Sequence, residues 1–128
     1  MLNCSCATAT VSSEGDVLDQ AQRDLLLSLA YMYASCDREP RALPLLLLVA
    51  AENPDDCDCL RLLAHVYTAM KRGELALVVL DRIRRLRPTE EPGDALLRAR
   101  ALHRTGRFKE AQTAFSVFAQ SNVRALAS

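Results

Sequence analysis

YASCDREPRALPLLLLVAAENP at residues 33–54 and YTAMKRGELALVVLDRIRRLRP at residues 67–88 are segments of equal length that share residues at matching positions. Each begins with tyrosine, carries alanine at its tenth position (Ala42 and Ala76), and ends with proline. All three pairs are separated by 34 residues, and three residue types rarely share one offset by chance. Such a period indicates repeated structural units, each of which buries its apolar face against its neighbours.

A third unit follows in the C-terminal third of the chain. Ala111 lies 35 residues after Ala76, so one residue is inserted near residues 90–93. Ala42, Ala76 and Ala111 are thus equivalent positions of the three units. A second alanine lies 12 residues before each of them: Ala30, Ala64 and Ala99. The sequence therefore predicts three units, at about residues 23–56, 57–90 and 92–125.

The pattern within each unit is helical. Apolar residues recur at three- and four-residue steps, which places them on one face of a helix. Two helices joined by a turn, with a 34-residue period, are the signature of the tetratricopeptide repeat. We predict an all-α fold in which three tetratricopeptide repeats form a short right-handed helical solenoid. This single domain covers residues 16–124 and follows a small, polar, aperiodic segment, residues 1–15, which we expect to be flexible.

Local signals predict the helix ends. The first helix is expected at residues 16–35, with Leu25, Leu29 and Met32 on its apolar face. Pro40 suits the first position of the next helix, where its missing N–H costs nothing. In the second repeat, residues 71–73 form the turn and residues 75–86 the return helix. Gly73 stands three residues before Ala76, whereas the turn glycine of such repeats stands five residues before.

The repeat register predicts which side chains form the core. The expected core residues are Leu26, Leu29, Ala30, Tyr33, Ala42, Leu46, Leu60, Leu63, Ala64, Tyr67, Ala76, Leu80, Ile83, Ala99, Leu102, Ala111 and Phe115.

The chain has an uneven charge distribution, and its sequence shows neither a secretory signal nor an apolar run long enough to span a membrane. The net charge is zero, but residues 1–64 hold 10 acids and 4 bases, whereas residues 65–128 hold 6 acids and 12 bases. The first ten residues lack a basic start followed by an apolar stretch, so no secretory signal is predicted. The longest apolar run, residues 42–51, is about half of a membrane span. We therefore expect a cytoplasmic protein that does not insert into membranes.

The chain offers little for catalysis or for a cofactor. Its odd number of cysteines argues against a disulfide framework. Cys57 and Cys59 would point roughly 200° apart on a helix, and no histidine follows at zinc-finger spacing. No carboxylate or thiol is spaced to form a relay with His65 or His103, and the scattered glycines form no phosphate loop. We expect no enzyme activity, no metal and no cofactor.

The four arginines at positions 82, 84, 85 and 87 could form a basic patch that binds nucleic acid. They spread around much of a helix, and no aromatic residues lie among them to stack on bases. A solvated helix face is the better interpretation, and no nucleic-acid partner is expected.

In tetratricopeptide arrays the first helix of each repeat lines a concave groove, which suits a peptide with apolar anchors. The register predicts a partner-binding groove from the three first helices, with a share of these residues packing between helices instead: Leu27, Ser28, Tyr31 and Ser35; Arg61, Leu62, His65, Thr68 and Ala69; Leu96, Leu97, Arg100, His103 and Arg104. Tyr31, Leu62 and His65 should meet at the junction of repeats one and two.

The C-terminal end of the last helix is predicted to lack the polar capping helix that ends a solenoid. We therefore expect an exposed apolar face at Phe118 and Val123, which marks a binding surface.

The span from about residue 23 to residue 120 resembles the small chaperones of bacterial type III secretion, in particular the YscY type. The matching stretches are Leu25–Leu27, residues 45–48 leading to Asn53 and Pro54, and residues 106–111 followed by Phe115. The resemblance implies a bacterial cytoplasmic chaperone that binds a small secreted YscX-type protein as a 1:1 heterodimer and escorts it to the export gate. Two alternatives are a translocator chaperone of the same system and a general repeat scaffold.

Overall fold

The structure is a computed structural model that describes residues 19–127, and within this range it contains six α-helices and no β-strand. The predicted all-α fold is thus confirmed. The helices belong to two compact units that divide between Pro54 and Asp55. The predicted flexible segment, residues 1–15, and the predicted helix start at residue 16 lie outside the described range.

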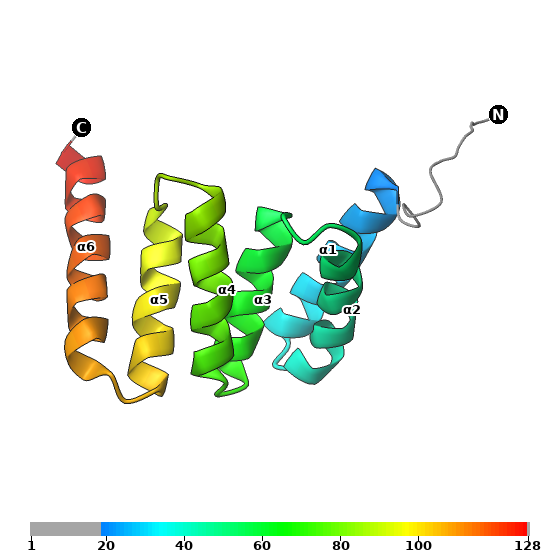
Figure 1. Ribbon diagram of the computed structural model, residues 1–128, viewed down its shortest axis with the longest axis horizontal. Helices are drawn as coiled ribbons and strands as arrows, with labels where there is room; N and C mark the ends of the chain where they lie inside the picture. The colour runs from blue at the N-terminus through cyan, green and yellow to red at the C-terminus, as the bar shows by residue number, and fades with distance from the viewer. Residues whose placement is uncertain (1–18, 128) are drawn as a thin grey trace. The chain divides into compact units, whose positions relative to one another are not determined.

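The N-terminal unit is a hairpin of α1 (Gln20–Ser35) and α2 (Glu39–Glu52) (Figure 1). Asp19 begins α1 with a capping box, because its carboxylate accepts a hydrogen bond from the Gln22 backbone N–H (2.8 Å) and the Gln22 side chain accepts one from the Asp19 N–H (3.1 Å). The second helix begins one residue earlier than predicted, so Pro40 occupies its second position. Pro44 lies inside α2, where it removes one backbone donor.

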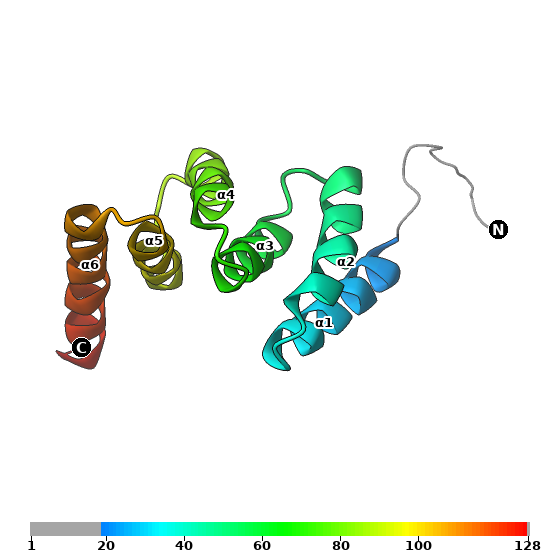
Figure 2. The same ribbon diagram turned by 90° about the horizontal axis from the view of Figure 1, so that it is seen from below.

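The C-terminal unit contains α3 (Cys57–Ala69), α4 (Gly73–Leu86), α5 (Pro92–Arg104) and α6 (Phe108–Ala127). The third helix contacts α4 and α5, and α5 also contacts α4 and α6. In Figure 2, α3 and α5 lie in one row, with α4 displaced to one side. The fifth helix is therefore the central element of the unit, with α3 on one flank and α6 on the other.

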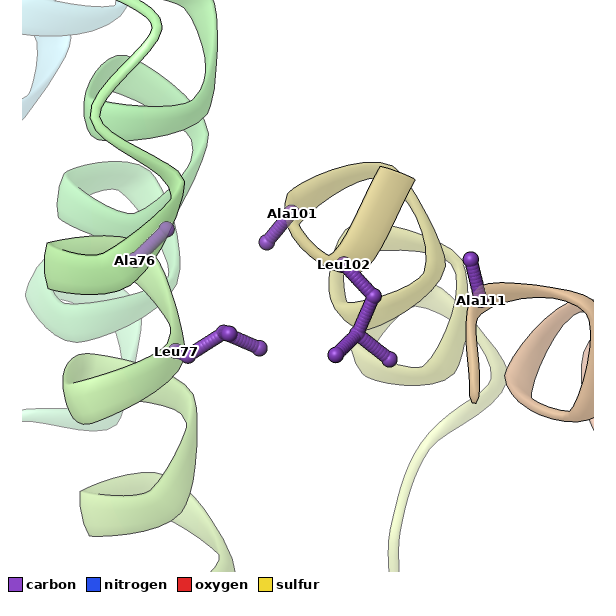
Figure 3. Packing of buried hydrophobic residues seen from close by; sticks show 5 residues of the cluster. All are labelled: Ala76, Leu77, Ala101, Leu102 and Ala111. Atoms are coloured by element: carbon purple, nitrogen blue, oxygen red, sulfur yellow. The ribbon is translucent and has the colours of Figure 1, made fainter. Parts of the chain in front are cut away.

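Two apolar clusters hold these helices together. Leu60 and Ala64 of α3 pack with Leu80 and Ile83 of α4. A second cluster joins α4, α5 and α6 through Ala76, Leu77, Ala101, Leu102 and Ala111. Figure 3 shows the side chain of Leu77 extending from α4 toward the end of the Leu102 side chain on α5. The alanines allow the helix backbones to approach closely, so a few leucines fill the remaining space.

The turns of the three hairpins repeat one backbone geometry. Asp37, Lys71 and Gly106 have positive φ angles of 58°, 63° and 82°, and they are spaced by 34 and 35 residues. In each turn the N–H of the following residue returns to a carbonyl five residues earlier, as in a Schellman motif. These bonds are Arg38 to Tyr33 (2.8 Å), Arg72 to Tyr67 (2.8 Å) and Arg107 to Leu102 (2.9 Å). The left-handed position therefore recurs even where the sequence has no glycine.

Replacing Lys71 by glycine should raise the free energy of unfolding by about 0.5–1 kcal/mol. A left-handed backbone costs a side chain with a Cβ roughly 1–2 kcal/mol, and glycine's greater freedom in the unfolded chain offsets part of the relief. Asp37→Gly is the matched comparison and should gain less, because aspartate tolerates this conformation better than lysine. Urea unfolding of both variants measures the difference, and a less stable Lys71→Gly would contradict the turn geometry.

The residue that lengthens the second period lies in a connection between hairpins. Four residues, 53–56, separate α2 from α3, whereas five residues, 87–91, separate α4 from α5. This place overlaps the predicted insertion near residues 90–93. Helices α2 and α4 have 14 residues each, α3 and α5 have 13 each, and the three hairpin turns have equal length, so the extra residue lies in the link between α4 and α5.

Most of the predicted core residues are buried, and Leu26, Tyr33 and Tyr67 are half-buried. Two predictions are wrong, because Leu29 is 37% exposed and Phe115 is 52% exposed. The first helix buries the face that carries Ala30 and Ala34, so the predicted face with Leu25, Leu29 and Met32 is exposed. Phe115 lies on a face of α6 that borders a groove. The repeat register did not identify Val49, Cys59, Val66, Leu77 and Ala101, which are also buried.

Candidate partner-binding groove

A groove of about 830 Å³ lies in the C-terminal unit, along α5 and between α3 and α6. It is lined by residues of all three helices: His65, Thr68 and Ala69; Leu96, Ala99, Arg100, His103 and Arg104; Phe108, Ala111, Gln112 and Phe115. The fifth helix contributes the largest share of the lining.

The wall formed by α3 presents one helical face, because His65, Thr68 and Ala69 are three and four residues apart. Thr68 is buried, and its hydroxyl donates a hydrogen bond to the Ala64 carbonyl (2.8 Å). This hydroxyl is therefore satisfied within the helix and places no unpaired polar group in the groove.

The wall formed by α6 is aromatic. Phe108 is 60% exposed, and Phe115 lies two helical turns later on the same face. The His103 ring meets the Phe108 ring edge-on, with centroids 5.1 Å apart and planes at 70°. Phe115 approaches Phe118 with centroids 6.0 Å apart. Exposed aromatic surface along a groove is a common feature of protein-binding sites.

The charged groups of the groove are all basic. Among its lining residues in the described part of the chain are Arg100, Arg104 and the two histidines, but no acid. Arg100 and Arg104 are exposed, stand one helical turn apart, and form no ion pair within residues 19–127. Other arginines of this unit do pair with acids, outside the groove lining: Arg61, Arg82, Arg84, Arg87, Arg98 and Arg107.

Arg61, predicted to line the groove, instead connects α3 to the start of α5. Its Nε donates to Asp94 Oδ1 (2.8 Å), and its Nη2 donates to Glu91 Oε1 (2.7 Å). The Asp94 side chain is only 6% exposed, and that of Arg61 is 24% exposed. The hydrogen bond to Asp94 is the main cause that raises the pKa of Arg61 above its ordinary value. This network fixes two of the three helices that line the groove, α3 and α5, relative to one another.

The predicted groove residues thus separate into groups. The structure brings together seven of them: His65, Thr68 and Ala69 on α3, and Leu96, Arg100, His103 and Arg104 on α5. Arg61, Leu62 and Leu97 lie outside the lining, and Leu97 packs against the cluster of α3 and α4.

Leu27 and Tyr31 belong to the N-terminal unit, where Leu27 is half-buried and Tyr31 is 63% exposed. Their part in a groove with Leu62 and His65 stays a prediction. At the C-terminal end, Val123 is exposed as expected, whereas Phe118 is half-buried beside Phe115. The exposed apolar residues there also include Val117 and Leu126.

The sequence reasoning missed the α6 wall, since it assigned groove residues to first helices only. Phe108 and Phe115 are seven residues apart with the small Ala111 between them, and this spacing could have identified an apolar face on α6.

Residues 19–127 contain no group of three or more His, Cys, Asp or Glu side chains that could hold a metal ion. Cys36 is exposed, Cys57 half-buried and Cys59 buried, and all three are free thiols. No helix in the described range combines the length and the apolar character needed to cross a bilayer.

Comparison with known proteins assigns no family to this chain, because no protein-family model and no curated protein matches it.

Proposed function

We propose that this protein is a non-catalytic chaperone of bacterial type III secretion, of the YscY type. It holds a small secreted YscX-type protein as a 1:1 heterodimer in the bacterial cytoplasm and escorts it to the export gate. The observation that carries the proposal is the groove of about 830 Å³, with its aromatic wall, on one side of a stack of helices. A surface of this kind suits a partner polypeptide that offers apolar side chains.

The repeated backbone geometry supports a tetratricopeptide architecture. Three hairpin turns with the same hydrogen bonds and the same left-handed residue, spaced by 34 and 35 residues, are what an array of such repeats requires. Arrays of this type present extended concave surfaces, and they commonly act by binding another chain.

Replacing Phe115 by glutamate should weaken binding of the secreted partner by about tenfold or more, because it places a charge in the apolar part of the groove. Val78→Glu is the matched control, since Val78 is a similarly exposed apolar residue on α4 that does not line the groove. The partner to test is a small secreted protein whose gene neighbours that of this chain. Calorimetry with the separately purified proteins measures the affinity, and light scattering of the co-expressed pair measures the stoichiometry. Equal affinities of the two variants would contradict binding in the groove.

A translocator chaperone of the same system and a general repeat scaffold are the alternatives, since either could use the same groove. Gene neighbourhood separates these roles from one another. Secretion-apparatus genes beside the coding sequence support an export chaperone, and their absence supports the scaffold.

A further inference from the structure

We propose that the groove takes an acidic amphipathic helix, whose apolar face contacts Phe108 and Phe115 and whose carboxylates pair with Arg100 and Arg104. This inference deepens the proposed function and rests on it for the identity of the partner.

The C-terminal unit carries more basic than acidic side chains. From residue 55 to the end, 13 Lys and Arg stand against 9 Asp and Glu. The acids are mostly engaged elsewhere: Asp94 and Glu91 hold Arg61, Asp81 and Glu90 hold Arg98, and Glu110 holds Arg107. Arg100 and Arg104 therefore form no ion pair with the acids of the described residues. A ligand with carboxylates would supply a counter-charge.

The surface beside the groove extends this basic region. A smaller hollow of about 420 Å³ adjoins it at Arg104 and is lined also by Lys71, Arg72 and Glu74. Lys71 and Arg72 are both exposed. Three cations against one acid make this end of the groove attractive to negative charge at distances within about 8 Å at physiological salt.

The groove runs along α5, with side chains of α3 on one flank and of α6 on the other. A helix about 10 Å in diameter, laid along α5, would contact side chains of all three helices. Arg100 and Arg104 are one turn apart, about 5–6 Å between Cβ atoms, which matches acids placed four residues apart on the incoming helix.

The test uses three fluorescein-labelled 18-residue helical peptides with one identical leucine and alanine face and a polar face of Glu, Gln or Lys. Fluorescence anisotropy with the full chain should show the Glu peptide binding about tenfold more tightly than the Gln peptide, with the Lys peptide weaker still. The preference should shrink in 0.5 M salt, because screening weakens charge attraction. Equal binding of the Glu and Gln peptides would overturn the proposal.

Two variants locate the effect. Arg104→Glu should remove the preference for the Glu peptide, whereas Arg85→Glu should retain it. The two substitutions change the net charge equally, and Arg85 is an exposed arginine of α4 outside the groove. Loss of the preference in both variants would show that overall charge, and not this groove, selects the peptide.

Two further results separate this inference from the proposed function. Binding of the Glu peptide through Arg104, without binding of the neighbouring secreted protein, would sustain the groove and refute the chaperone role. Binding of the neighbouring secreted protein, with no preference for the Glu peptide, would sustain the chaperone role and refute the inference about the groove. If sedimentation shows a dimer of the free chain that Arg104→Glu dissociates, a second copy occupies the groove and the inference fails.

Discussion

Arg61→Ala is expected to lower the free energy of unfolding by about 2–3 kcal/mol, measured by urea denaturation at neutral pH. The loss comes from Asp94, whose side chain is 6% exposed and receives its 2.8 Å hydrogen bond from Arg61 Nε. Without the guanidinium this carboxylate stays buried with its main charged partner missing. The exposure of Arg61 itself, 24%, limits the cost to less than that of a fully buried pair.

Arg82→Ala is the control for this prediction, because Arg82 pairs with Asp55 where both side chains are well exposed, 44% and 60%. Its cost should be about 0–0.5 kcal/mol. Removing Asp94 together with Arg61 should cost less than the sum of the single changes, since no buried charge is then left alone. Equal losses in Arg61→Ala and Arg82→Ala would show that burial of Asp94 contributes nothing.

The second large effect concerns Gly73, the first residue of α4. Gly73→Ala should lower the free energy of unfolding by about 1–3 kcal/mol. A Cβ at this position would lie 2.7 Å from the Ala101 carbonyl oxygen and 2.7 Å from Thr105 Cγ2. The carbonyl belongs to the backbone of α5, so α4 and α5 must separate to admit the methyl group. Urea unfolding measures the cost.

Two other glycines provide the comparison, because the same substitution meets different surroundings. Gly93→Ala adds a methyl group with nothing within 4 Å, and it should leave stability unchanged or raise it by up to about 1 kcal/mol. Gly106→Ala has equal space but a φ of 82°, so it should cost about 1–2 kcal/mol through backbone strain. If Gly73→Ala behaved like Gly93→Ala, the close contact between α4 and α5 would be refuted.

The sequence predicted those features that depend on spacing within the chain. The 34-residue period gave the helices and the hairpin turns, and the 35-residue step located the extra residue between α4 and α5. The period also identified seven residues of the groove on α3 and α5. These properties follow from helical periodicity, which one chain segment carries by itself.

Features that depend on a distant neighbour could not be predicted in this way. Arg61 shares the periodicity of a groove residue, but its partner Asp94 lies 33 residues away on another helix. Gly73 resembles a turn glycine until the position of Ala101 is known. Leu29 and Phe115 have the pattern of core residues, yet each lies on a helix face that the rest of the described chain covers only in part. Periodicity shows that a face is apolar and leaves open what covers it.

The longer connection between α4 and α5 also determines where the chain can be engineered. The hairpin turns fix every residue between two hydrogen-bonded helix ends, so an added residue there would shift one helix against the other. The link at residues 87–91 is already one residue longer than the equivalent link at residues 53–56, and Thr89 within it is exposed. An epitope tag, a fluorescent label or a protease site belongs at Thr89, where it reports on the protein without entering the helices that line the groove.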